Sequence, residues 1–327
     1  MPFLDKPERG FLLGKFMPPH QGHVFLCDFA RAYCRKLTIL VCSQPDDPIP
    51  GYLRHRWMQE LYPDCNVVAC QDALPQEPAN DSNFWTIWRE VIARYAPENP
   101  DVVFASETYG MKLAAEIGAR FVPVDISRTA RPISATDIRR NPMQHWDALP
   151  PVVRPYYARR VTLFGAESSG KSTLAKALAA HYRTIIVPEY GRTHTETFGD
   201  CGEEGLREIV MGHLASVEAA KRQANRVIIE DTDPVLTAIW SDMLIGHRDP
   251  WFADYADHGD LYILTELDVP WEQDGIRYFG NEADRRRFYD LCVAELERRN
   301  IPYVRVAGPR EQRFMTAVEA IDRLLAD

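Results

Sequence analysis

Two stretches of the chain combine residue types that bind phosphate, and they lie in different halves of the sequence. The sharper one reads GAESSGKST and stands between a strand-like apolar run and a helical pattern. In such a loop the backbone N–H groups surround a phosphate, the lysine reaches the β- and γ-phosphates, and the next hydroxyl binds Mg²⁺. We therefore predict an ATP-binding P-loop formed by Gly165, Glu167, Ser168, Ser169, Gly170, Lys171, Ser172 and Thr173.

Acidic residues that would complete this site follow two other apolar runs. The run VIIEDTD supplies Asp231 as a second Mg²⁺ ligand and leaves Asp233 available to a phosphoryl acceptor. In PEYGR, Glu189 is either the base for an acceptor hydroxyl or an ordinary surface acid. Nucleoside and nucleotide kinases often carry an acceptor-binding acid there, and Arg192 is the matching candidate for a ribose or phosphate contact.

Kinases of this type also carry arginines on a lid that closes over the transferred phosphoryl group. The segment DGIRYFG offers Arg277, which we expect to contact ATP. The run at 285–287 contains three further arginines, but arginines in succession on a helix are more typical of a solvated face.

The other phosphate-binding stretch reads GKFMPPHQGH and also stands where a strand gives way to a helix. The first turn of a helix has unpaired N–H groups and the positive end of the helix dipole, so anions bind there. Two imidazoles add donors to the same anion, and a glycine between them lets the backbone approach a triphosphate. The candidate ATP-binding residues are Gly14, Lys15, Phe16, His20, Gly22 and His23.

About 110 residues later, the segment ISATDIR predicts a second strand-to-helix junction. Ser134 can cap the helix, while Thr136 and Arg139 face the same direction. Arg139 suits bidentate contact with phosphate, and together with Lys15 it could stabilise charge on a departing pyrophosphate. The two motifs therefore predict a second ATP site, in the first half of the chain.

The elements that must position these motifs alternate along the chain as strand, helix, strand, which is typical of parallel sheets covered by helices. We predict strands at 11–16, 37–42, 66–70, 101–105, 120–124, 161–165, 184–188, 226–230, 260–265 and 302–306. Helices are expected near 23–35, 53–62, 84–95, 109–117 and 206–217, the last with His213 on its buried stripe as a core residue. Prolines break the pattern at 147–160. The fold class is α/β, with two doubly wound parallel-sheet domains at 1–150 and 151–327.

Composition narrows the classes of function. The 327 residues carry a formal net charge of −9, which gives no general attraction to nucleic acid or to anionic lipid. Seven scattered cysteines without a CxxC pair argue against a disulfide framework or a zinc site. The first residues do not resemble a signal peptide, and no run of 18 apolar residues occurs. We expect a cytoplasmic protein that binds small molecules and neither nucleic acid nor membranes. The oligomeric state is left open, with a homo-oligomer as one possibility.

The paired HxGH and SxTxIR motifs resemble those of the nucleotidyltransferase superfamily, and six residues match position by position. They are His20, Gly22, His23, Ser134, Thr136 and Arg139. The resemblance implies transfer of an adenylyl group from ATP to an anionic acceptor, with release of pyrophosphate. Because a phosphate acceptor is already a nucleophile, the protein needs only to align it and stabilise charge.

The acceptor is indicated by NFWTIWR, which resembles a stretch of nicotinamide mononucleotide adenylyltransferases in which a Trp stacks on the nicotinamide ring. Trp88 is the matching residue, and an indole face suits a pyridinium cation; a core role for Trp88 stays open. A core role is weighed more heavily for Trp85, which stands where relatives often carry Asn, so the resemblance does not extend to the hydrogen bond expected from that Asn. The segment SETYG resembles the acceptor and adenine loop of the same family, with Ser106, Glu107 and Tyr109 as the contacts.

Over about residue 10 to the end, the order of motifs resembles the NadR family, whose members join a nicotinamide mononucleotide adenylyltransferase to a ribosylnicotinamide kinase. The resemblance implies that ATP, ribosylnicotinamide, nicotinamide mononucleotide, NAD and Mg²⁺ bind. Some members carry an N-terminal helix-turn-helix repressor domain, and because only about ten residues precede the first predicted strand, we expect neither that domain nor its repressor function here. The residues expected to act in catalysis are His20, His23, Arg139, Lys171, Glu189 and Asp231.

Two other interpretations remain open from the residues. A bifunctional coenzyme A synthase also joins an HxGH-type transferase to a P-loop kinase, although Trp88 and the PEYGR and DGIR segments argue against it. A nucleotide sensor that binds NAD and ATP to regulate a partner belongs to a different class, and steady-state turnover in both halves would exclude it.

Overall fold

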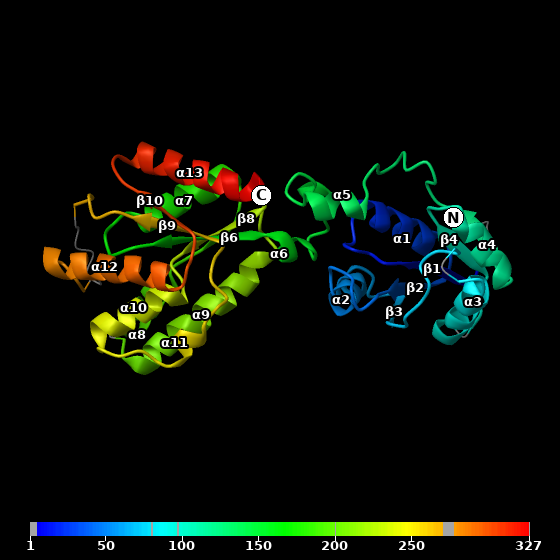
Figure 1. The fold of residues 1–327 in the computed structure, drawn as a ribbon, viewed down its shortest axis with the longest axis horizontal. Coiled ribbons are helices and arrows are strands. Elements are labelled where there is room, and N and C mark those ends of the chain that lie inside the picture. The colour runs from blue at the N-terminus through cyan, green and yellow to red at the C-terminus, as the bar shows by residue number, and fades with distance from the viewer. Residues whose placement is uncertain (1–4, 80, 97, 200, 271–277, 327) are drawn as a thin grey trace. The chain divides into compact units, whose positions relative to one another are not determined.

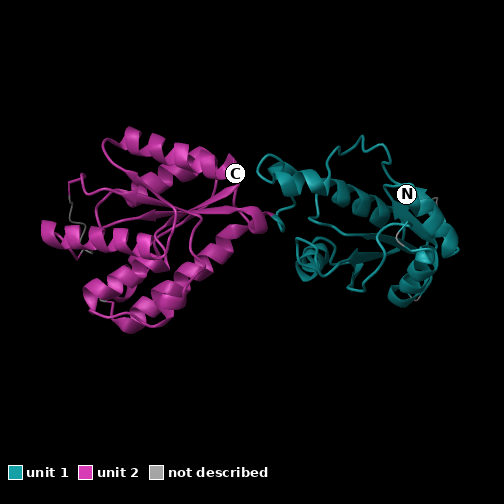
Figure 2. Ribbon diagram, in the orientation of Figure 1, with its two compact units in different colours: residues 1–153 teal, residues 154–327 magenta. Residues whose placement is uncertain are grey.

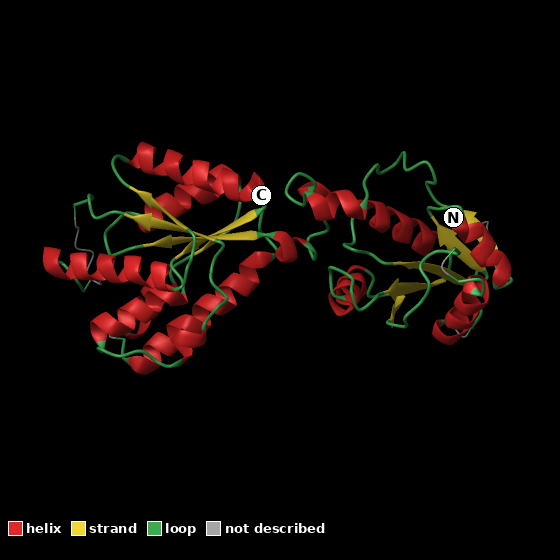
Figure 3. Cartoon of the chain, in the orientation of Figure 1, coloured by secondary structure: helices red, strands yellow, loops and turns green. Residues whose placement is uncertain are grey.

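Each half of the molecule is built on one parallel five-stranded sheet. The computed structural model describes residues 5–79, 81–96, 98–199, 201–270 and 278–326. It divides into two units, Met1–Val153 and Arg154–Asp327 (Figure 2). All of the strand pairs that form the two sheets are parallel, and helices cover both faces of each sheet (Figures 1 and 3). The predicted fold class is confirmed.

In the first unit the strands follow the order β3-β2-β1-β4-β5. The strands are β1 (Arg9–Gly14), β2 (Lys36–Cys42), β3 (Asn66–Cys70), β4 (Val102–Ala105) and β5 (Arg120–Pro123). The helices are α1 (Gln21–Tyr33), α2 (Gly51–Leu61), α3 (Phe84–Tyr95), α4 (Tyr109–Glu116) and α5 (Ala135–Arg140), followed by the short 3-10 helix η1 (Trp146–Ala148).

In the second unit the order is β10-β9-β6-β8-β7. The strands are β6 (Arg159–Phe164), β7 (Ile186–Val187), β8 (Val227–Asp231), β9 (Leu261–Thr265) and β10 (Tyr303–Val306). The helices are α6 (Arg154–Tyr157), α7 (Lys171–Tyr182), α8 (Tyr190–Phe198), α9 (Glu203–Lys221), α10 (Pro234–Leu244), α11 (Trp251–Asp254), α12 (Glu282–Arg298) and α13 (Arg310–Ala326).

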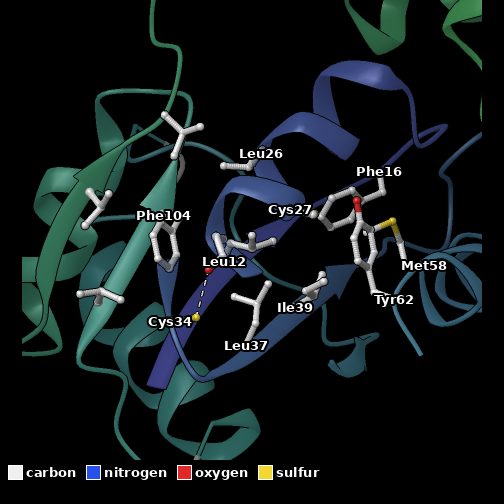
Figure 4. Close-up of a cluster of buried hydrophobic side chains, with 14 of the residues drawn as sticks. Leu12, Phe16, Leu26, Cys27, Cys34, Leu37, Ile39, Met58, Tyr62 and Phe104 are labelled. Carbon is white, nitrogen blue, oxygen red and sulfur yellow. Dashed lines mark hydrogen bonds between the residues drawn. The ribbon is translucent and has the colours of Figure 1, made fainter. Parts of the chain in front are cut away.

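Successive strand residues pack on opposite faces of each sheet, because side chains alternate along a strand. Leu12 of β1 belongs to the core under α1 and α2, which Figure 4 shows, whereas its neighbour Phe11 packs with Phe84 and Trp88 on the other face. A strand that is buried on both faces appears in the sequence as a continuous apolar run. This is why the strands were visible in the sequence.

Most strand boundaries differ from the prediction by one or two residues, and for two strands the difference has a local reason. β6 begins at Arg159, before the expected residue 161, because Arg160 is buried in an ion pair with Glu230 that an apolar pattern cannot reveal. β7 is shorter than the expected 184–188. Pro188 has no N–H to donate, and Thr184 uses its side-chain hydroxyl to bond the Val227 carbonyl.

A one-turn helix, α6, also occupies part of the proline-rich stretch that was expected to interrupt the pattern. Pro155 is its second residue, and a proline is tolerated in the first turn of a helix because no intrahelical N–H bond is lost there. Among the helices that the structure describes, none is both long and apolar enough to cross a membrane.

Both sheets change the direction of their winding at one point, and the predicted motifs follow the strands that border it. In the first unit this point lies between β1 and β4, and in the second between β6 and β8. At such a point the connecting helices leave toward opposite faces and open a crevice at the carboxyl ends of the strands. The fold thus predicts one ligand crevice in each unit.

Candidate active sites

The first unit contains a cavity of about 570 Å³ at the carboxyl ends of β1 and β4. Its walls bring together most of the residues expected to bind ATP and the acceptor, although these lie up to 120 positions apart in the chain. They are Gly14, Lys15, Phe16, His20, Gly22, His23, Trp88, Ser106, Glu107, Tyr109 and Ser134. A cavity of this size accommodates a nucleotide.

Two histidines stand together at the start of α1, with their ring centroids 3.8 Å apart. His20 caps the helix, because its Nδ1 accepts the N–H of Gly22 at 3.1 Å, which leaves Nε2 as the proton-bearing donor. A Cβ on Gly22 would lie 3.0 Å from the His20 ring, so a larger residue there would require the ring to shift by a few tenths of an ångström. Burial, then the charge of Arg128, lowers the pKa of His20 to about 4, and burial also lowers the pKa of His23.

At neutral pH these two imidazoles are therefore uncharged. They can donate hydrogen bonds to a phosphate without adding positive charge. The positive charge must come from other residues. Lys15 lies beside Asp47 at 3.7 Å, and Arg128 and Arg131 line the cavity.

The aromatic wall of this cavity contains both tryptophans of α3. Trp88 is 7% exposed, and its indole N–H donates to the Pro75 carbonyl at 3.2 Å, so it both packs in the core and lines the cavity. Trp85 also lines the cavity, with the Lys112 ammonium 4.8 Å from the centroid of its ring. That cation already occupies one face of Trp85. Trp88 is therefore the better candidate to stack on a pyridinium ring.

Two residues of the SxTxIR motif that were expected to bind ATP, Thr136 and Arg139, do not line the cavity. Arg139 donates to the Met17 carbonyl at 2.5 Å and to the Thr136 hydroxyl at 3.2 Å, so both side chains are engaged within the protein. Ser134 caps α5 by accepting the N–H of Asp137, as the motif predicted. In this arrangement Arg139 joins α5 to the loop after β1, and it must change partners to reach a phosphate.

Sequence reasoning missed three arginines around this cavity. Arg128 pairs with Glu107 at 3.1 Å across the rim, and Arg131 lies in the same loop before α5. Arg54 of α2 is fully buried, and it donates to the carbonyls of Lys15 and Cys42 at 2.6 and 3.0 Å. No motif marks them, because isolated arginines in loops and helices are common; only their tertiary contacts distinguish them.

The second unit contains a narrower cavity of about 170 Å³ at the carboxyl ends of β6 and β8. It is lined by Glu167, Ser168, Ser169, Gly170, Lys171, Ser172, Thr173, Glu189 and Arg192 among the expected residues. The Lys171 ammonium is folded back onto its own loop, where it donates to the carbonyls of Gly165 and Ala166 at 3.0 and 2.8 Å. A bound nucleotide would have to draw it away from these carbonyls.

The conformation of the P-loop depends on its glycines. Gly165 has a φ of +133°, and a Cβ there would lie 2.6 Å from the Thr265 hydroxyl of β9. Ser168 and Gly170 also have positive φ values of +55° and +89°. Such alternation makes successive N–H groups converge and form a concave site for an anion.

The aspartate that ends β8 and the one that follows it have different environments, although neither lines the cavity. Asp231 is 4% exposed, and its Oδ1 atom has no hydrogen-bond partner among the residues that the structure describes. Asp233 caps α10 by accepting the N–H of Leu236 at 3.1 Å and accepts the hydroxyl of Tyr262 with its other oxygen. Because both Asp233 oxygens are engaged and it does not line the cavity, the geometry does not support its expected contact with an acceptor.

Glu189 lies on the cavity wall next to the P-loop, 3.9 Å from Arg192. Burial raises the pKa of its carboxyl above the ordinary value, although the charge of Lys171 opposes the shift. A carboxylate with a raised pKa is a stronger base, which favours the catalytic alternative for this residue.

Aromatic side chains also line this cavity, which the sequence analysis missed. Trp240 of α10 stacks on Phe279 with centroids 5.6 Å apart and meets Tyr278 edge-on at 6.0 Å. Trp240 and Tyr278 line the cavity. The backbone N–H groups of Tyr278 and Phe279 donate to Glu167 of the P-loop at 3.1 and 3.0 Å. In the sequence, Trp240 is indistinguishable from the other apolar residues of its helix.

The expected lid is only partly within the structure. Arg277 lies outside the described residues. Arg285 donates to the Val269 carbonyl at 3.2 Å, and Arg286 and Arg287 lie on an open surface of α12.

His213 is buried and lies 3.2 Å from Glu230, as expected of a core histidine.

Comparisons with known proteins find similar sequences for the whole chain and for parts of it. A family model described as an AAA domain matches residues 160–313. The trifunctional NAD biosynthesis/regulator protein NadR of Escherichia coli (strain K12) is 30% identical over 351 residues, covering 99% of this chain and 85% of that protein. The nicotinamide-nucleotide adenylyltransferase of Thermococcus onnurineus (strain NA1) is 26% identical over 149 residues, which is 44% of this chain and 79% of that protein.

A crystal structure of a NadR protein in complex with NR superposes on 99% of this chain and 97% of its own, with a TM-score of 0.77 and 21% sequence identity. A likeness at this level of identity shows that the two chains share a fold.

Proposed function

The chain belongs to the NadR family, and we propose that it makes NAD in two steps, with one active site in each unit. In this proposal residues 151–327 are a kinase domain that converts ribosylnicotinamide to nicotinamide mononucleotide, and residues 1–150 are an adenylyltransferase domain that converts the mononucleotide to NAD. The observation that carries the proposal is the presence of one cavity in each unit, lined both by residues of a predicted phosphate-binding motif and by aromatic side chains.

In the kinase step, a ribose hydroxyl oxygen of ribosylnicotinamide forms a bond to the γ-phosphorus of ATP, and the bond to the ADP oxygen breaks. Glu189 accepts the hydroxyl proton, and the raised pKa of its carboxyl suits this role. Lys171 leaves the carbonyls of its own loop and binds the phosphate oxygens. Trp240 and Tyr278 provide aromatic surface for the nicotinamide ring.

The kinase site fits a Mg²⁺ ion, which would neutralise charge on the phosphate oxygens. A carboxylate that is buried without a hydrogen-bond partner is costly, and the Oδ1 atom of Asp231 is such an atom among the described residues. Asp231 and the hydroxyl of Ser172 would hold the ion. No group of three or more His, Cys, Asp or Glu side chains in the described ranges could hold a metal. The nucleotide phosphates must therefore supply further ligands.

In the adenylylation step, the phosphate of the mononucleotide forms a bond to the α-phosphorus of ATP, and the bond to pyrophosphate breaks. No general base is required, because the attacking oxygen is already anionic. The neutral His20 and His23 donate hydrogen bonds to phosphate oxygens, and Lys15, Arg128 and Arg131 supply positive charge.

The direct test is incubation of the full-length chain with ribosylnicotinamide, ATP and Mg²⁺. We expect the mononucleotide to appear first, with ADP, and NAD to follow, with pyrophosphate. A chelator should stop phosphorylation of ribosylnicotinamide. Formation of dephospho-coenzyme A from 4′-phosphopantetheine, without NAD from the mononucleotide, would instead support the coenzyme A interpretation; tight binding without turnover would support a sensor.

The two tryptophans provide a matched prediction. Trp88→Leu should raise the KM for the mononucleotide about 30-fold, which is about 2 kcal/mol, because a desolvated cation-π contact is lost although an apolar side chain remains. Trp240→Leu should raise the KM for ribosylnicotinamide by a similar factor. Each variant should leave the KM for ATP in its own reaction nearly unchanged.

Trp57→Leu is the control, because Trp57 is buried in the first unit and does not line its cavity. It should lower the Tm without changing the KM for the mononucleotide. A Trp88 variant whose KM values for the mononucleotide and for ATP rise equally would show that Trp88 only packs the core.

A further inference from the structure

A buried arginine from the last helix reaches the P-loop. Arg313, in the first turn of α13, is 5% exposed. Its guanidinium donates to the carbonyls of Ser169 at 2.9 Å, Gly308 at 2.9 Å and Glu266 at 3.4 Å. These three carbonyls belong to the P-loop and to the loops after β10 and β9. One side chain thus joins three loops at the carboxyl edge of the sheet.

An acidic partner fixes the position of this guanidinium. The carboxylate of Asp268 accepts a hydrogen bond from Arg313 and another from the N–H of Gly308 at 2.5 Å. A buried cation is stable only when it is paired and its donors are satisfied. Asp268 and the three carbonyls provide both the counter-charge and the acceptors, so the guanidinium has little freedom to turn.

The contact with Ser169 has a consequence for phosphate binding. In a planar trans peptide, the carbonyl and the N–H of the next residue point in opposite directions. Because Arg313 holds the Ser169 carbonyl on the side of α13, the N–H of Gly170 is directed away from α13. Gly170 lines the cavity and has a φ of +89°, as in loops whose N–H groups converge on an anion.

We propose that Arg313 is a positioning residue for the kinase reaction, which fixes the Ser169–Gly170 peptide so that its N–H binds the β-phosphate of ATP. This inference rests on the proposed kinase function. Arg313 does not contact the reacting atoms in this account; it acts through one peptide plane. Substitution of Arg313 should therefore weaken the binding of ligands that carry a β-phosphate and leave the binding of ligands that lack one unchanged.

The test is product inhibition of ribosylnicotinamide phosphorylation by the full-length chain. For Arg313→Met, the inhibition constant of ADP and the KM for ATP should each rise tenfold to about 100-fold, as expected for loss of one hydrogen bond to a charged group. The inhibition constant of AMP and the KM for ribosylnicotinamide should stay within about twofold. Arg313→Lys retains the charge but not the planar fork, so it should restore part of the ADP affinity.

Two controls separate positioning from stability. Arg310→Met alters an exposed arginine of the same helix and should leave every constant unchanged. Adenylylation of supplied mononucleotide reports on the first unit and should persist in all variants. If Arg313→Met does not fold, Asp268→Asn keeps the arginine and weakens its anchor, and ADP inhibition should again weaken more than AMP inhibition.

Unchanged ADP inhibition in a folded variant, or an equal loss for ADP and AMP, would overturn the proposal. Failure of the proposed function looks different, because the unaltered chain would then release no ADP from ribosylnicotinamide and ATP.

Discussion

Lys171→Ala is expected to abolish the conversion of ribosylnicotinamide to the mononucleotide while leaving adenylylation of supplied mononucleotide within a few-fold of normal. Lys171 is the cation of the P-loop, and its ammonium is 3.0 Å or less from two carbonyls of its own loop, ready to bind phosphate instead. Loss of transition-state charge stabilisation of this kind costs 100-fold or more in kcat, or about 3 kcal/mol. Steady-state kinetics of the two reactions, measured separately, provide the check.

Lys176→Ala is the matched control, because Lys176 is an exposed lysine on the same helix and does not line the cavity. The kinase activity of the Lys176 variant should equal that of the unaltered chain. A Lys171 variant that kept more than a tenth of normal kinase activity would show that the P-loop lysine does not stabilise the transferred phosphoryl group.

His23→Ala is expected to have the reverse effect, with adenylylation reduced 100-fold or more and the kinase retained. The His23 ring lies in the wall of the cavity of the first unit, 3.8 Å from the His20 ring. Given ribosylnicotinamide and ATP, this variant should accumulate the mononucleotide. His55→Ala, which alters a histidine of the same unit outside the cavity, should make NAD normally.

Mixing the Lys171 and His23 variants should restore NAD formation, because the intermediate can diffuse from one molecule to another. If either substitution removed both activities in a protein that still unfolded cooperatively, the two sites would be coupled, and the assignment of one reaction to each unit would be wrong.

The features that the sequence predicted well are those that depend on neighbours along the chain. The P-loop is nine consecutive residues whose own backbone forms the phosphate site, so its chemistry can be read without knowing what packs against it. The strands were visible because a strand buried on both faces is a continuous apolar run. Ser134 was identified as a helix cap because its partner is only three residues away.

The features that the sequence did not reveal depend on partners that are distant along the chain. The expected availability of Asp233 to an acceptor was not supported, because Tyr262, on another strand, takes one of its oxygens. Trp240 was missed because only the packing of α10 against the P-loop crevice turns an ordinary apolar residue into a cavity wall. The neutrality of His20 follows from burial, which residue type alone does not specify.

For this protein, the sequence by itself determined the fold class and the local motifs from which two nucleotide sites are predicted, because backbone geometry and side-chain type set these over a few residues. The tertiary structure decided which side chains are free to meet a ligand and which are engaged elsewhere. Arg313 reaches the Ser169 carbonyl from 144 positions away, and Arg54 reaches Lys15 from 39. Such contacts exist only when helices dock on the sheet, because the hydrogen bond depends on distance in space and not on spacing in the chain.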